Sequence, residues 1–362
     1  MRYILTTVGL SSLTNGLRGI FTAKEIYNFS NMNENEIDKN FKYKFDNELE
    51  KFINKVKNYD NEKLEELSAE LNALLKYYKN DFNQNDFHKL LITDTYLGKK
   101  SAEVIKSILE DKGFKVDIYA PKDLKTSDIE SFHLSLSEVV KDLSEELENY
   151  KNGGYKIIFN LTGGFKSVNS FMQNMASLWA DESIYIFESS KELLTIPKLP
   201  LKVDESIFKE KVEVFRLLES GIDIDEVRLK DIPKTLILKI GNEYTLSPWG
   251  EIVWQKIKIE IFKNLLKYKC IEYSNEFKKD FEKLSDNEKF QINKMFDLLD
   301  KYKLTNDEKF NLRSLRYHEL KGQIAQKYSH EFYPFDGGDS RRAYCNENDR
   351  KVIVEKIDAH IK

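Results

Sequence analysis

Residues 155–180 read YKIIFNLTGGFKSVNSFMQNMASLWA, and this stretch decides the fold class. YKIIFNL is apolar and rich in β-formers, as a buried strand is, whereas Ser167–Ala180 places apolar side chains at helical spacing. The segment TGGFK joins the two as a tight turn. A strand that leads directly into a helix is half of a β-α-β unit, whose strands lie parallel in one sheet.

The same alternation runs through the first 200 residues. The other strand-like runs are Tyr3–Val8, 88–95, 114–120 and 183–188. An amphipathic helix at 99–113 joins two of them, and a helix at 134–150 joins the next pair. We therefore predict an α/β domain with a parallel sheet over residues 1–200. The helical, charge-rich segment 34–80 has no strand character, and we interpret it as an insertion.

The rest of the chain changes character. TIPKLPLKVD, at 195–204, holds two of the six prolines and predicts the exit from the first domain, so we assign residues 201–270 to a small connector. Within 271–362, two helices precede strand-like runs, and Ser285-Asp-Asn-Glu288 forms a capping box at the second helix. Helices followed by a small antiparallel sheet predict an α+β domain.

Composition excludes several classes of protein. The 57 Lys+Arg nearly balance the 61 Asp+Glu, which argues against a general nucleic-acid coat or a polybasic membrane binder. The two cysteines, Cys270 and Cys345, lack metal-ligand spacing, so we expect neither a disulfide scaffold nor a metal, and no cofactor. No apolar run approaches the roughly 18 residues of a membrane span, and the N-terminus lacks the apolar core of a signal peptide. We expect a cytoplasmic protein with no membrane partner.

Polar or glycine-rich segments follow the predicted strands at their carboxyl ends, where open parallel sheets bind ligands. These segments are Gly9–Asn15, Thr93–Thr95 and Thr162–Lys166. The glycines let the backbone approach a phosphate, and Lys166 at a helix N-terminus adds positive charge. A tight turn alone would also explain Thr162-Gly-Gly164, so the loop by itself is weak evidence.

Three ordered motifs together are more specific. They are ILTTVGLSSLTN at 4–15, LLITDTYLGKKSAEVIKSILEDKGF at 90–114 and IIFNLTGGFKSVNSFMQNMASLWADESIYIF at 157–187. In this order they resemble the CARF domain, the CRISPR-associated Rossmann fold, over about residues 1–200. The resemblance implies a homodimer that holds a cyclic oligoadenylate, and from the general habit of the family we expect cyclic tetra-adenylate.

The resemblance also implies which residues contact this ligand. By position they are Gly9, Leu10, Ser11, Ser12, Asn15, Thr93, Asp94, Thr95, Thr162, Gly163, Gly164 and Lys166. Leu10 departs from the family, where Thr is often found between Gly and Ser. Some relatives cleave the ring with a serine and a lysine that match Ser11 and Lys166, so binding with cleavage and binding without it both stay open.

The C-terminal region holds the residue types of a metal-free ribonuclease. Such an enzyme needs a base for the ribose 2′-hydroxyl, cations for the charged phosphorus centre and an acid for the leaving 5′-oxygen. The candidates are Arg316, His318, Lys321, His330, Arg341, Arg342, Tyr344 and His360. Strand alternation places Arg316 and His318 on one face but separates Arg341 from Arg342.

This region resembles the RelE-type toxins, which are ribosome-dependent mRNA endonucleases. The resemblance rests on the paired helices, HELKG, SHEFYP, RRAYC and the C-terminal tail, over about residues 272–362. It implies a catalytic set drawn from those eight residues, with His330 or Glu331 as candidate base, and the ribosome and mRNA as partners. The near-neutral net charge of −4 agrees with this, because an enzyme that uses RNA held by a ribosome needs few phosphate contacts of its own.

We thus predict a CRISPR type III ancillary effector that is activated by cyclic oligoadenylate, cleaves mRNA and halts translation. Two alternatives stay open. A HEPN ribonuclease on an all-helical domain would use Arg313 and His318, which have the spacing of that motif. A ligand-gated transcription regulator would use residues 205–265 as a winged helix.

Overall fold

The computed structural model describes residues 1–79, 81–125, 128–187, 192–335, 338–349 and 351–359. The chain divides into two compact units. Unit 1 comprises Met1–Val203 and Ser247–Ile252, and unit 2 comprises Asp204–Leu246 and Val253–Lys362. A search of the described residues finds no helix with the length and apolar character that a membrane span requires.

Unit 1 is built on a mixed sheet with the strand order β3-β2-β1-β4-β5-β6. Its strands are β1 Arg2–Thr7, β2 Phe87–Leu91, β3 Lys115–Tyr119, β4 Lys156–Asn160, β5 Glu182–Ile186 and β6 Leu193–Pro197. Neighbouring strands from β3 to β5 are parallel, and β6 is antiparallel to β5. This order agrees with an α/β, Rossmann-like fold, but the prediction of a purely parallel sheet was wrong at the β6 edge.

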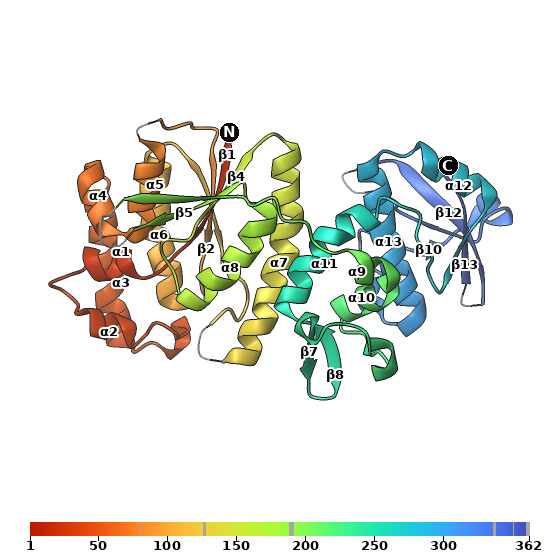
Figure 1. Cartoon of the computed structure of the whole chain (residues 1–362), viewed down its shortest axis with the longest axis horizontal. Coiled ribbons are helices and arrows are strands. Elements are labelled where there is room, and N and C mark those ends of the chain that lie inside the picture. Colours follow the sequence, from red (N-terminus) through yellow and green to blue (C-terminus); the bar gives the residue numbers. More distant parts are fainter. Residues whose placement is uncertain (80, 126–127, 188–191, 336–337, 350, 360–362) are drawn as a thin grey trace. The chain divides into compact units, whose positions relative to one another are not determined.

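Helices cover both faces of this sheet (Figure 1). They are α1 Ser11–Gly16, α2 Ala23–Tyr27, α3 Lys39–Val56, α4 Asn61–Leu67, α5 Ala69–Tyr78, α6 Tyr96–Asp111, α7 Ile129–Asn152 and α8 Lys166–Trp179, with a 3₁₀ turn at Glu34–Glu36. The core around Ile4 and Ile158 takes residues from α1 to α6, whereas the core around Leu5 and Phe159 takes residues from α7 and α8. Neighbouring residues such as Ile4 and Leu5 belong to different cores because successive side chains of a β-strand point to opposite faces of the sheet.

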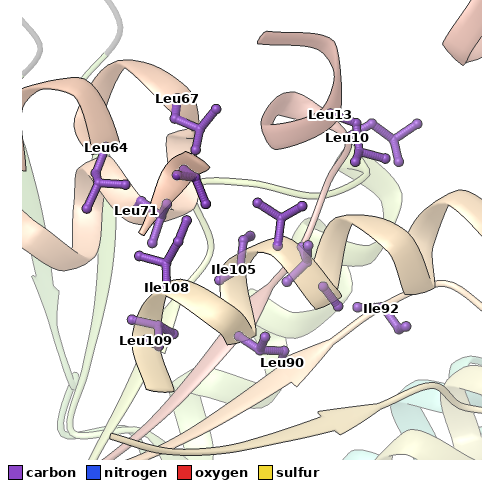
Figure 2. Packing of buried hydrophobic residues seen from close by; sticks show 14 of the residues in the cluster. Leu10, Leu13, Leu64, Leu67, Leu71, Leu90, Ile92, Ile105, Ile108 and Leu109 are labelled. Carbon is purple, nitrogen blue, oxygen red and sulfur yellow. The ribbon is translucent and has the colours of Figure 1, made fainter. Parts of the chain in front are cut away.

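The segment 34–80, predicted to be an insertion, contains α3, α4 and α5. Helix α5 leads into β2, and its Leu71, Leu74 and Leu75 are buried. Figure 2 shows this packing: Leu64, Leu67 and Leu71 of α4 and α5 lie beside Ile105, Ile108 and Leu109 of α6 and near Leu90 of β2. Helix α5 is therefore a crossover helix of the fold, held in place by the core.

Unit 2 begins with a short helical and hairpin segment. Its helices are α9 Ser206–Glu210, α10 Val212–Glu219 and α11 Pro248–Ile261, with 3₁₀ turns at Glu226–Leu229 and Lys234–Leu236. Strands β7 Ile237–Ile240 and β8 Glu243–Leu246 form an antiparallel hairpin. The first residues of α11 are counted with unit 1. Most of the predicted connector, 201–270, is counted with unit 2.

The remainder of unit 2 contains an α+β arrangement. Helices α12 Asn275–Lys283 and α13 Asp286–Thr305 accompany strands β9 Ile271–Tyr273, β10 His318–Glu319, β11 His330–Phe332, β12 Arg341–Asn348 and β13 Lys351–Ala359, and further 3₁₀ turns occur at Glu308–Phe310 and Gly322–Gln326. The strand order is β10-β11-β12-β13-β9. Pairs from β10 to β13 are antiparallel as predicted, whereas β9 is parallel to β13. We call this the C-terminal sheet.

Candidate functional site

The first candidate site lies at the carboxyl ends of β1 and β4, between Gly9, Gly163 and Gly164, and we call this place the crevice. Strand β1 pairs with β2 on one side and with β4 on the other, so the strand order reverses there, and open α/β sheets bind ligands at such a point. The loops after the two strands meet closely. A Cβ atom at Gly9 would lie 2.8 Å from the backbone nitrogen of Gly164, and Gly164 itself has a φ of +95°. Both positions therefore need glycine.

A carboxylate fills this crevice. Glu70 of α5 is fully buried, and its Oε1 accepts a hydrogen bond of 2.6 Å from the backbone N–H of Gly9. Its Oε2 accepts hydrogen bonds from the hydroxyls of Ser11, at 2.9 Å, and Ser68, at 2.8 Å. A Cβ atom at Gly163 would lie only 1.9 Å from Oε1. Gly9, Ser11 and Gly163, which the sequence analysis proposed as ligand contacts, thus surround an internal anion.

Sequence analysis missed Glu70. Ser68 caps α5 and Glu70 lies in the first turn of that helix, which is where acidic residues commonly stabilise a helix N-terminus. That ordinary role hid the contact, because the partners Gly9 and Ser11 are far away along the chain.

Two side chains stabilise the loop after β4 by hydrogen bonds to its backbone. The carbonyl of Gly163 accepts hydrogen bonds from the Thr7 hydroxyl at 2.8 Å and from Nδ2 of Asn169 at 2.7 Å. Among the described residues, the buried Thr162 Oγ1 and Asn169 Oδ1 have no hydrogen-bond partner. Lys166, the first residue of α8, is exposed. The two oxygen atoms can therefore form further hydrogen bonds with a ligand at this loop, and Lys166 supplies a positive charge to the same loop.

Leu10 and the α1 residues Ser12 and Asn15 contact neighbouring elements. The Ser12 hydroxyl lies 2.7 Å from that of Ser101, Leu10 is buried, and Nδ2 of Asn15 donates to the carbonyl of Leu67 at 3.0 Å. Asn15 also lines an open groove of about 510 Å³ together with Arg18. This part of the loop therefore connects α1 to its neighbours.

The predicted second motif makes local contacts instead. The hydroxyls of Thr93 and Thr95 lie 3.0 Å apart, and Thr95 accepts from the N–H of Gly98 at the start of α6. Asp94 forms an ion pair of 2.9 Å with Lys99. These residues stabilise the N-terminus of α6. Among the described residues, no hydrogen bond joins their side chains to Glu70, Gly9 or Ser11.

The second candidate site is one face of the C-terminal sheet. His318 pairs with Glu331, and Glu331 pairs with Tyr344, so these three residues share a face. Arg342, two residues before Tyr344 on β12, shares it as well. The opposite face carries Phe332, Ala343, Cys345 and Val354, which pack with residues of α12 and α13.

An acid–base pair and two cations lie on the first of these faces. His318 Nε2 is 3.4 Å from Glu331 Oε1, while the buried Glu331 Oε2 has no partner in the described part of the chain. The Arg342 guanidinium lies 3.6 Å from the centre of the Tyr333 ring, and Arg316 donates to the hydroxyl of that tyrosine at 3.1 Å. Within the same described part, Arg342 Nε is buried and unpartnered. We call His318, Glu331, Arg342, Arg316 and Tyr333 the sheet-face cluster.

Other predicted catalytic residues lie elsewhere. His330 is on the opposite face, where it stacks on Tyr317 with ring centroids 4.9 Å apart and lies 3.4 Å from Glu347. Burial lowers its pKa, and the nearby Glu347 offsets only part of that effect. Arg341 forms ion pairs with Glu288, at 2.6 Å, and Asp339, at 2.7 Å.

The last three candidates differ in exposure and environment. Lys321 is exposed and precedes the 3₁₀ turn Gly322–Gln326. Tyr344 shares the face of the cluster but is fully buried, with its ring stacked on Tyr328 and its hydroxyl donating to the carbonyl of Ala359 at 3.3 Å. His360 lies outside the described residues.

The described residues contain no group of His, Cys, Asp and Glu side chains arranged to hold a metal ion. At the sheet face, His318 and Glu331 are groups that can exchange protons, and the two arginines can bind phosphate oxygens.

Comparison with known proteins bears on unit 1. Residues 65–199 match the family model of a CRISPR-associated protein, Cas_APE2256. The matched stretch includes Glu70 and the loop Thr162–Lys166, but it includes neither Gly9 nor any residue of unit 2. No curated protein gives a significant match to the chain. The similarity supports a CRISPR-linked role and agrees with a CARF-type sensor domain.

Proposed function

We propose that this protein is a CRISPR ancillary effector in which unit 1 binds a cyclic oligoadenylate and unit 2 cleaves mRNA on the ribosome. The CRISPR-associated match of residues 65–199 supports the link to defence. The glycine-bounded crevice at the strand reversal supports a ligand site, because it offers backbone N–H and hydroxyl donors to an oxyanion. In this proposal the protein acts as a homodimer, with cyclic tetra-adenylate as the expected ring.

The sheet-face cluster is the observation that carries the proposal of RNA cleavage. His318 takes the proton from a ribose 2′-hydroxyl, and Glu331 beside it stabilises the protonated imidazole. The 2′-oxygen attacks the adjacent phosphorus, the bond from phosphorus to the 5′-oxygen breaks, and the leaving oxygen takes up a proton from water. Arg342 and Arg316 stabilise the added negative charge on the phosphate. The products are a 2′,3′-cyclic phosphate and a 5′-hydroxyl.

Two other candidates from the sequence, Tyr344 and Arg341, fit this reaction less well. Tyr344 is buried and donates to a backbone carbonyl, so in this proposal it supports the sheet from within. Arg341 is paired with two carboxylates, which occupy the donors that a phosphate would need. His330 lies on the opposite face from Glu331 and is not part of the same cluster.

The proposal is tested with the full chain and purified ribosomes that translate a defined mRNA. Each cyclic oligoadenylate is added separately, and cut sites are mapped by primer extension. Ring-dependent cuts within translated codons support the proposal. Cuts that appear equally on naked RNA, or no cuts with any ring, contradict it.

The two alternative functions, a HEPN ribonuclease and a transcription regulator, make different demands on the fold. A HEPN ribonuclease built on Arg313 and His318 needs a helical bundle, whereas His318 begins a strand of the C-terminal sheet. That geometry argues against the HEPN hypothesis. A transcription regulator would bind DNA through a winged helix, and the hairpin β7–β8 followed by α11 is the segment that it would use. A gel-shift assay with promoter DNA, in the presence and absence of the ring, distinguishes a transcription regulator from an RNA-cleaving effector.

A further inference from the structure

We propose that Glu70 is an internal competitor for the anionic ligand: its carboxylate occupies the donors that a ligand phosphate needs and thereby sets the affinity of the crevice. This inference rests on the proposed function, since it concerns an anionic ring bound at the ends of β1 and β4. The inference adds a residue, Glu70, that sets the concentration of cyclic oligoadenylate needed to occupy the crevice.

The first step of the argument is the convergence of donors. One backbone N–H, from Gly9, and two hydroxyls, from Ser11 and Ser68, point at the two oxygens of one carboxylate over distances of 2.6 to 2.9 Å. Backbone amides next to glycine and serine hydroxyls are the donors that proteins use for phosphate oxygens. A site that solvates a buried carboxylate in this way is an oxyanion site that already holds an oxyanion.

The second step is the absence of a counter-charge. Glu70 is fully buried. Among the residues that the structure describes, no cationic side chain forms an ion pair with it. A buried carboxylate without a cation is costly, and only its hydrogen bonds compensate for the lost water. The carboxylate is therefore held by the same donors that an incoming phosphate would take.

The third step is mutual exclusion. One oxygen, Glu70 Oε1, accepts the hydrogen bond of the Gly9 N–H and also occupies the space next to Gly163, where a Cβ atom would lie only 1.9 Å from it. Two anions at this spacing would also repel one another in a buried site. A phosphate can enter only when the carboxylate leaves, so the apparent affinity falls by the fraction of molecules in which Glu70 has left.

The remainder of α5 can stay in place during this exchange. Leu71, Leu74 and Leu75, which follow Glu70 on the helix, are buried in the core of unit 1. The movement is thus confined to the Glu70 side chain and the first turn that Ser68 caps. When the carboxylate has left, the unpartnered Thr162 Oγ1 and Asn169 Oδ1 beside the same loops are available to ligand hydroxyls.

The test compares Glu70→Gln with Glu66→Gln in the full chain. Both changes remove one carboxylate from neighbouring positions, but Glu66 is exposed. The amide of Glu70→Gln keeps an acceptor for the Gly9 N–H without the charge, and circular dichroism and thermal melting verify that each variant folds. Calorimetric titration with cyclic tetra-adenylate then measures the Kd.

We expect Glu70→Gln to bind the ring about tenfold more tightly or better than the wild type, and Glu66→Gln to bind like the wild type. A merely structural role predicts the opposite sign, because damage to the loops weakens binding. If the wild type binds and Glu70→Gln, Glu70→Ala or both fold yet gain no affinity, the competitor role is overturned and the ligand assignment stands. If neither the wild type nor any folded Glu70 variant binds the ring, both the inference and the proposed ligand are overturned.

Discussion

Arg341 and Arg342 are neighbours in the sequence but have different environments. Arg342 lies over the ring of Tyr333 on the face that carries His318, whereas Arg341 is paired with Glu288 and Asp339. The two residues therefore form a matched pair for mutagenesis.

We predict that Arg342→Ala lowers the rate of RNA cleavage by about a hundredfold or more, because it removes a cation that stabilises charge on the phosphate. Arg341→Ala serves as the control and should retain most of the cleavage rate while losing some thermal stability. Rates are measured on translated mRNA at saturating ring. Equal losses in the two variants would contradict the assignment of the sheet face.

His88 of β2 predicts a dependence of stability on pH. It is fully buried, its Nε2 lies 2.9 Å from the Tyr78 hydroxyl, and burial lowers its pKa from 6.5 to about 3. Between these values the unfolded chain binds a proton that the folded chain does not, so stability falls as the pH falls below 6.5.

The loss attributable to His88 between pH 7 and pH 5 is about 2 kcal/mol. Urea unfolding followed by circular dichroism checks this in the wild type and in His88→Phe, which cannot titrate. We expect the free energy of unfolding of the variant to change less over this interval, by about that amount. Parallel pH profiles for the two proteins would rule out this role for His88.

Part of each candidate site is visible in the sequence. Strand alternation separates Arg341 from Arg342 without any structure. The pairing of His318 with Glu331 is not accessible in this way, because it depends on the register between two strands joined by a loop. Glu70 was missed for a related reason, since its contacts are made across the sheet edge with residues near the N-terminus.

At the level of elements, α10 and α13 are joined by a buried ionic cluster. Arg216 of α10 donates to Asp297 at 2.5 Å and to Asp300 at 2.9 Å, both on α13, and its side chain is 1% exposed. Lys301 is paired with Asp297 at 2.6 Å. Part of the predicted connector is thus attached to the helix that supports the C-terminal sheet.

Replacement of Arg216 by Met should destabilise unit 2 by about 3–5 kcal/mol, because the buried Asp300 loses its ion pair and the buried Asp297 keeps only the one with Lys301. Arg228→Ala is the control. Arg228 pairs with Glu213, but both side chains are about 40% exposed, so its loss should cost about 1 kcal/mol or less. Chemical denaturation of both variants gives the comparison, and similar small losses would show that the buried cluster contributes little.

The sequence predicts the elements of the fold better than their edges. The helix α13 stripe of Ile292, Met295, Phe296 and Leu299 is buried as its spacing indicates. Strand β6 was not predicted as a strand, because its last residues belong to the proline-containing segment 195–204 that was interpreted as the exit from the first domain. Proline is tolerated there because β6 is an edge strand and Pro197 is its last residue, where a missing N–H costs little.

At the scale of the whole molecule, the proposed function joins a ring sensor to a ribonuclease in one chain. A ligand shifts only those states that it binds unequally, so the ring must bind the cleaving state more tightly than the resting state. The central claim is that occupation of the crevice in unit 1 controls cleavage at the sheet face of unit 2.

The most direct test measures the rate of mRNA cleavage on translating ribosomes with and without cyclic tetra-adenylate, for the wild type and Lys166→Ala. Lys166 is exposed beside the crevice and distant in sequence from the sheet-face cluster, so its loss should remove the response to the ring and leave the fold intact. The account predicts a rise in wild-type cleavage of about tenfold or more on addition of the ring, and no rise for Lys166→Ala. A wild-type rate that does not change with the ring, or full activation of Lys166→Ala, would contradict it.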